Sequence, residues 1–221
     1  MKKLLVVLVL SLSFSGCINY IQDVQLYADG SGSMRITFWT KMPGNESTKL
    51  LDKIGIGIFN PDSIHAEFSS KYTSIKSIRV YTDTTDSTTH AIINLKFTHI
   101  DSLNKTKAFT SSEFSLKDGD EGQKIFTQFI QPISTGFGVN GNAYHVTYKY
   151  TFGGYIISDN STAKDGRTLI WDYTLSQIGS GKTISVTFRP FKLKETPPWI
   201  YALSGLVLLI VIIFLLRKKK D

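Results

Sequence analysis

An uncharged, strongly apolar stretch near the C-terminus most constrains what this 221-residue chain can fold into. Trp199–Leu216 contains no charged side chain, and as a helix it would rise about 27 Å, close to the roughly 30 Å hydrocarbon core of a bilayer. Two prolines precede it, where a helix tolerates them, and four cations follow at 217–220. We therefore expect a transmembrane helix over 197–216 and a cytoplasmic basic tail over 217–221.

The N-terminus has the pattern of a secretory signal. Two lysines are followed by an apolar run over Leu4–Leu12 and then by small residues that lead to Cys17, the one cysteine in the sequence. The residues FSGC at 14–17 resemble the bacterial lipobox, in which a cysteine after small residues is lipidated and becomes the mature N-terminus. We expect 1–16 to be a lipoprotein signal peptide and Cys17 to carry an acyl anchor. The alternative is a free or intermolecularly paired thiol, because one cysteine excludes a disulfide within one molecule.

The net charge of +7 argues at first for nucleic acid or another acidic partner. The two lysines of the signal account for two of these charges and the tail over 217–221 for three, so the segment between them carries only about +2. Its one local gathering of cations is Arg189, Lys192 and Lys194, where solvent or anionic lipid headgroups would meet them. We therefore predict no nucleic-acid partner.

Residues 17–196 are long enough to form one extracytoplasmic domain with its own core. Alternating apolar residues predict strands in hairpins, as at 20–28 and 34–42 on either side of the turn DGSG at 29–32. Stretches with helical spacing are few and short. We predict an α+β fold, in which a curved antiparallel β-sheet of hairpins or a meander carries a few short helices, followed by the single C-terminal transmembrane helix.

The strand predicted over 125–130 has apolar residues on both faces, whereas a sheet backed by solvent has one apolar face. Ile125 and Phe129 lie on one face of this strand, and Phe126 and Ile130 lie on the other. We expect the core to cover one face and a second cover, such as the segment Gly55-Ile56-Gly57, to leave a cavity for acyl chains over the other.

The candidate ligand-binding residues are the apolar ones of this strand, a tryptophan and three cations. The tryptophan either anchors the core or lines an apolar pocket, and the cations would lie at the level of lipid headgroups. The complete set is Ile125, Phe126, Phe129, Ile130, Trp171, Arg189, Lys192 and Lys194.

The sequence contains no familiar catalytic or metal-binding motif. The residues GSGKT at 179–183 resemble the end of a phosphate-binding loop, but Ser176 replaces the first glycine and a strand, not a helix, is predicted to follow. The four histidines have no metal-ligand spacing, and a zinc deaminase would need a second cysteine. We therefore predict no enzyme activity, no cofactor and no metal. An enzyme of unrecognised type remains a third alternative.

Several of these features together resemble one protein family. Cys17 followed by a strand, the DGSG turn, a second strand, YTFGGYIISDN at 150–160 and LIWD at 169–172 are similar to the LppM-type bacterial envelope lipoprotein ectodomains with a C-terminal transmembrane span. The resemblance extends from end to end of the chain, and its motifs are structural. It implies an α+β ectodomain at the cell envelope with lipid binding suspected, and it carries over no catalytic residues.

Two functions from different classes follow. The first is a lipoprotein of the bacterial cytoplasmic membrane, single-pass, whose periplasmic or cell-surface domain binds a lipid or another apolar ligand near the membrane. The alternative is a protein-interaction, or scaffold, module that holds another envelope protein through an exposed edge or apolar patch. An internal cavity would favour the first function and a flat exposed patch the second.

Overall fold

The computed structural model describes residues 18–41, 59–132, 145–191 and 198–218. The chain divides into two compact units, Met1–Pro190 and Phe191–Asp221. The described strands belong to the first unit, and helix α5 (Pro198–Lys218) belongs to the second.

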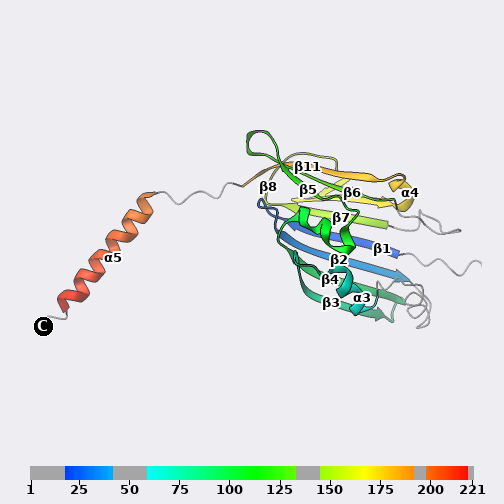
Figure 1. Cartoon of the computed structure of the whole chain (residues 1–221), viewed down its shortest axis with the longest axis horizontal. Helices are drawn as coiled ribbons and strands as arrows, with labels where there is room; N and C mark the ends of the chain where they lie inside the picture. Colours follow the sequence, from blue (N-terminus) through cyan, green and yellow to red (C-terminus); the bar gives the residue numbers. More distant parts are fainter. Residues whose placement is uncertain (1–17, 42–58, 133–144, 192–197, 219–221) are drawn as a thin grey trace, which may run out of the picture. The chain divides into compact units, whose positions relative to one another are not determined.

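Within the described residues the first unit contains two β-sheets (Figure 1). The larger, sheet A, is 7-stranded with the spatial order β3-β4-β2-β1-β7-β10-β9. Neighbouring strands in this sheet are antiparallel, except β1 and β7, which run parallel to each other. In spatial order its strands are β3 (Thr73–Asp83), β4 (Thr88–Phe97), β2 (Gly32–Lys41), β1 (Ile18–Leu26), β7 (His145–Phe152), β10 (Thr168–Thr174) and β9 (Ala163–Asp165).

The second sheet, sheet B, is 4-stranded and antiparallel among the residues the structure describes. In spatial order its strands are β5 (Ser115–Asp118), β6 (Lys124–Ile130), β11 (Lys182–Pro190) and β8 (Gly154–Asp159). The chain passes from sheet A to sheet B at Gly153, the residue between β7 and β8. A Cβ on Gly154 would lie 2.4 Å from the carbonyl oxygen of Arg189, so only glycine lets β8 start this close to β11.

Short helices accompany the sheets. Helix α3 (Pro61–Phe68) begins after Asn60, whose side-chain oxygen accepts hydrogen bonds from the backbone N–H groups of Asp62 and Ser63 at 2.9 and 3.1 Å. It contacts β3 and buries Ile64. The other short helices are η1 (Ile100–Lys105), η2 (Lys107–Phe109), η3 (Asp120–Gly122) and α4 (Leu175–Ile178).

The hydrophobic core is formed by the inner faces of the two sheets and by these helices. Aromatic side chains from both sheets meet within it. The Phe126 ring on β6 lies 4.9 Å from that of Tyr150 and 5.7 Å from that of Phe152, both on β7. The Phe152 ring lies in turn 4.9 Å from the Phe188 ring on β11. Sheet B therefore packs directly on β7 through aromatic contacts.

Trp171 on β10 is fully buried and links sheet A to sheet B. Its indole N–H donates to Asn160 Oδ1 at 2.9 Å. The same oxygen accepts the backbone N–H of Ser185 at 2.9 Å, and Asn160 Nδ2 donates to the carbonyl oxygen of Thr183 at 2.7 Å. The interpretation of Trp171 as a core residue therefore agrees with the structure.

A buried polar cluster also joins the two sheets. Gln22 on β1 donates from Nε2 to the Tyr150 hydroxyl at 2.8 Å, and that hydroxyl donates to Gln128 Oε1 on β6. The Tyr20 hydroxyl donates to Gln22 Oε1 at 2.7 Å. Because both glutamine side chains are buried, these hydrogen bonds replace the water that the amides lose on folding. Burial raises the pKa of the Tyr20, Tyr148 and Tyr150 hydroxyls above the ordinary value of about 10.

The predicted curved sheet with few short helices agrees with a domain that is mostly β-strand, but its sheet topology needs a correction. The strands form two sheets, and β1 pairs in parallel with β7, which is distant in the sequence. Alternation along a strand predicts which of its faces is buried. It does not predict which distant strand lies beside it.

The predicted transmembrane helix over 197–216 is also corrected. The stretch is helical as α5, but among the described residues no helix is both long enough and apolar enough to cross a membrane.

Replacing Trp171 with alanine should lower the free energy of unfolding by about 3–5 kcal/mol, because it empties a large buried site and removes the hydrogen bond to Asn160. Urea denaturation followed by far-ultraviolet circular dichroism measures the change. Trp39→Ala is the matched control, since Trp39 is only half-buried on β2, and it should cost less than half as much. Equal costs would contradict a core role for Trp171.

Raising the pH above about 10 should destabilise the domain. The buried tyrosines hold their protons more tightly in the folded state, so their contribution to stability is complete below pH ~10 and is lost as the pH rises above that value. Urea midpoints measured between about pH 8 and pH 11 should fall in the wild type and fall less steeply in Tyr148→Phe. Tyr27→Phe, at an exposed position, should follow the wild type. A wild-type midpoint that does not change over this range would contradict the burial of ionisable hydroxyls.

Candidate functional site

The outer face of sheet B exposes several large apolar side chains. On β6, Phe126 points into the core, so Ile125 lies on the opposite face, where it is 38% exposed. On β8, Ile156 packs against the core, so its two neighbours Tyr155 and Ile157 point outward and are 69% and 49% exposed.

The strand register brings these side chains near one another. Strand β11 lies between β6 and β8, with Thr187 opposite both Ile125 and Ser158. The pairing of β11 with β8 shifts between Thr187 and Phe188, because β8 has one extra residue there, Ile157. Since neighbouring strands are about 4.8 Å apart, Ile125 lies roughly 10 Å from β8. We call Ile125, Tyr155 and Ile157 the apolar patch.

Two cations border the apolar patch. Lys117 on β5 is opposite Ile125, and Arg189 on β11 is opposite Tyr155. These two side chains give the apolar patch a cationic border, and cations favour contact with an anionic surface.

The residues predicted as ligand contacts have different positions in the structure. Ile125 and Arg189 lie together on the outer face of sheet B, whereas Phe126, Ile130 and Trp171 are buried in the core. Whether any of them binds a ligand stays a prediction.

Phe129 lies on the same face of β6 as Ile125 and is half-buried. A Cβ on Gly181 would lie 2.3 Å from its ring, so the backbone of the turn before β11 covers that ring. The described residues thus cover the second face of β6 only in part. The other predicted residues, Cys17, Lys192 and Lys194, and the predicted cover over 55–57 lie outside the described residues.

Tyr155, Ile157 and Lys117 were not among the ligand-binding residues predicted from the sequence. One signal was available, because the consecutive apolar residues Tyr155-Ile156-Ile157 put apolar side chains on both faces of β8, as at 125–130 on β6. That these outer faces belong to one sheet depends on the pairing of β6 and β8 with β11.

In the described parts of the chain, no three His, Cys, Asp or Glu side chains come together in a way that could hold a metal ion. The Thr88 hydroxyl donates to Asp86 Oδ1 at 2.6 Å and lies 2.7 Å from His90 Nε2, but the His90 ring stacks on Tyr81 at 4.9 Å. This arrangement stabilises the turn between β3 and β4.

Comparison with known proteins found a similar solved structure but no matching protein family. No protein-family model matches the sequence, and no curated protein matches it. Among solved structures, the NMR structure of the folded domain of the LppM protein of Mycobacterium tuberculosis is similar, with a TM-score of 0.50 and 14% sequence identity. The similarity covers 81% of this chain and 94% of that chain. At this identity the comparison establishes the fold alone, and the domain has an LppM-like fold.

Proposed function

We propose that this chain is a lipoprotein of the bacterial cell envelope whose β domain binds a lipid surface through the apolar patch. The observation that carries the proposal is the exposure of three large apolar side chains, Ile125, Tyr155 and Ile157, beside Lys117 and Arg189 on one end of sheet B. Contact with acyl chains removes such side chains from water, at about 25 cal/mol for each Å² of apolar surface. The two cations would attract anionic headgroups.

A protein partner is the alternative, because a flat exposed patch rather than an enclosed cavity also fits a protein interface. The cationic border favours the lipid surface, since interface cores are depleted in lysine and a bilayer with anionic lipids attracts each nearby cation by about 1 kcal/mol. The sequence resemblance to envelope lipoproteins and the LppM-like fold support the same choice.

An acyl group on Cys17 would give the domain a second point of contact. Cys17 immediately precedes β1, and Leu26 at the other end of β1 is opposite Phe152, next to the corner that leads into β8. At about 3.3 Å per residue, these two ends of β1 are roughly 26 Å apart. Contacts at Cys17 and at the apolar patch would therefore hold the strands along the lipid surface, not upright on it.

The double substitution Tyr155→Ser with Ile157→Ser should weaken binding to vesicles that contain phosphatidylglycerol by about tenfold or more, because it removes two exposed apolar contacts. Co-sedimentation of the fragment 18–191 with the vesicles measures this. The matched control is Tyr27→Ser, at a 46% exposed aromatic residue that follows β1, and it should bind as the wild type does.

Two outcomes would decide against the lipid surface. One is wild-type binding to vesicles that is too weak to measure. The other is equal binding by the double variant and by Tyr27→Ser. A photo-crosslinking amino acid at position 155 that then captures a single envelope protein in cells would favour the interaction module instead.

Cys17→Ala should abolish incorporation of a labelled fatty acid into the protein, because Cys17 is the one cysteine in the chain. The label is detected on the purified full-length protein by gel fluorescence after growth with an alkyne fatty acid. Ser15→Ala, a change to another small residue in the same motif, should retain the label. Label that persists in Cys17→Ala would contradict the lipoprotein assignment.

A further inference from the structure

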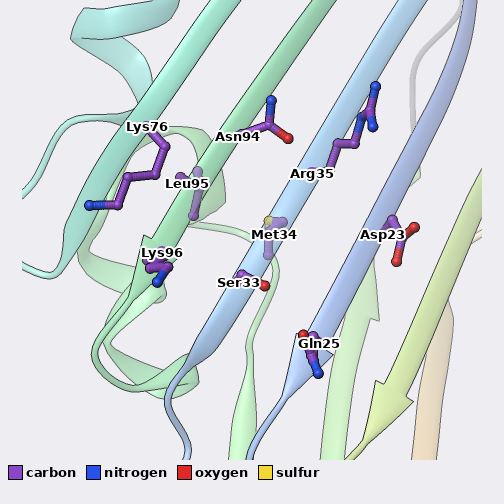
Figure 2. Close-up of a pocket in the computed structure, with 9 residues that line it drawn as sticks. All are labelled: Asp23, Gln25, Ser33, Met34, Arg35, Lys76, Asn94, Leu95 and Lys96. Atoms are coloured by element: carbon purple, nitrogen blue, oxygen red, sulfur yellow. The ribbon is translucent and has the colours of Figure 1, made fainter.

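A groove lies on the outer face of sheet A, on the other side of the domain from the apolar patch. It crosses β1, β2, β4 and β3 and has a volume of about 360 Å³ (Figure 2). Met34 and Leu95 line it but are buried, so the side chains that reach its surface are polar or charged. It therefore offers no apolar lining for an acyl chain.

Three cations surround this groove: Arg35 on β2, Lys96 on β4 and Lys76 on β3. Figure 2 shows them spaced apart on their three strands, with none pointing at another. None of the three forms an ion pair with another residue in the described part of the chain. Their charges are therefore available to a ligand.

Among the described residues that line the groove, one carboxylate is present, and it does not cancel these charges. Asp23 on β1 lies opposite Arg35 on one side and opposite Lys149 of β7 on the other. Directly opposite residues on a sheet are neighbours, so this single negative charge is shared between two positive ones. The groove keeps a net positive charge.

The backbone of β3 places Lys76 at the groove. A register shift occurs between Ile75, which is opposite Leu95, and Ser77, which is opposite Asn94, so Lys76 is the extra residue of a β-bulge. Bulges redirect a side chain and are common beside binding sites. The Asn94 side chain is also held in place, because its Nδ2 donates to the Ser77 hydroxyl at 2.9 Å.

We propose that this groove binds a water-soluble ligand that carries two or more phosphate groups along its length. Phosphate offers several acceptor oxygens to Arg and Lys alike. Arg35 and Lys76 lie on strands that are separated by β4, and Figure 2 shows their side chains extended in different directions, so in this arrangement they do not converge on one small anion. A ligand with several phosphate groups can contact both cations at once.

The choice of a soluble ligand over a lipid headgroup rests on the proposed function. The outer faces of two packed sheets point in opposite directions. If the apolar patch of sheet B meets a lipid surface, the groove on sheet A faces the aqueous phase. The positive charge of the groove itself does not depend on that function.

The test is the affinity of the full-length protein for linear inorganic polyphosphate, measured by isothermal titration calorimetry at low and raised salt. The triple variant Arg35→Gln, Lys76→Gln, Lys96→Gln should bind about tenfold or more weakly, and each single variant about two- to fivefold more weakly. Raised salt should weaken wild-type binding, because the contacts are electrostatic. Lys182→Gln, which removes an exposed lysine of β11, is the matched control and should bind as the wild type does.

Each other outcome has a defined meaning. Absence of wild-type binding, or equal binding by the triple variant and Lys182→Gln, overturns the site. If orthophosphate binds as tightly as polyphosphate, the proposal that the ligand carries two or more phosphate groups is wrong. If the triple variant loses binding to phosphatidylglycerol vesicles but keeps polyphosphate binding, the groove binds lipid headgroups and not a soluble ligand.

A second pair of measurements separates this site from the proposed function. If the Tyr155→Ser, Ile157→Ser variant loses vesicle binding and keeps polyphosphate binding, the two faces act independently, as proposed. Thermal unfolding of each variant shows whether it is folded. Because all the changed groove side chains lie on an outer sheet face, their melting temperatures should stay close to that of the wild type.

Discussion

The packing of sheet B onto the inner face of sheet A is the constraint on which the rest of the structure depends. Phe126 of sheet B meets Tyr150 and Phe152 of sheet A, and neither sheet could keep its aromatic inner face away from water alone. The hydrogen bonds from Gln22 through Tyr150 to Gln128 are satisfied in this register. A shift of one residue would turn these side chains to the other face, so the buried cluster specifies the register as well as the packing.

This packing leaves two outer faces that differ in chemistry. The face of sheet B carries the apolar patch with Lys117 and Arg189 at its border. The face of sheet A carries the groove with its cations on β2, β3 and β4. Both proposals concern these outer faces, while aromatic side chains from the two sheets meet inside the core. A lipid surface on one face and a phosphate-bearing ligand on the other would be compatible, since neither occupies the other's position.

Hairpins, caps and buried faces were predictable because they depend on residues close together in the sequence. The turn DGSG at 29–32 indicated the β1–β2 hairpin, and the cap of α3 is a local contact from Asn60 to the two residues after Pro61. Trp171 among strand residues indicated a core position, which its burial agrees with. Ile125 and Arg189 were candidates before their positions were known. Nothing local to either residue indicated that both lie on one face of sheet B, beside Tyr155.

Local residue patterns were enough to predict which segments form strands, which face of each strand is apolar, and where turns interrupt them. The folded structure was needed to show that β1 pairs in parallel with β7, that the chain passes to sheet B at Gly153, and that the bulge residue Lys76 lines the same groove as Arg35 and Lys96. The physical reason is that side-chain alternation has a period of two residues and depends on the strand itself. Strand pairing depends on contacts between segments far apart in the chain, and any strand with a matching apolar face could satisfy the same local pattern.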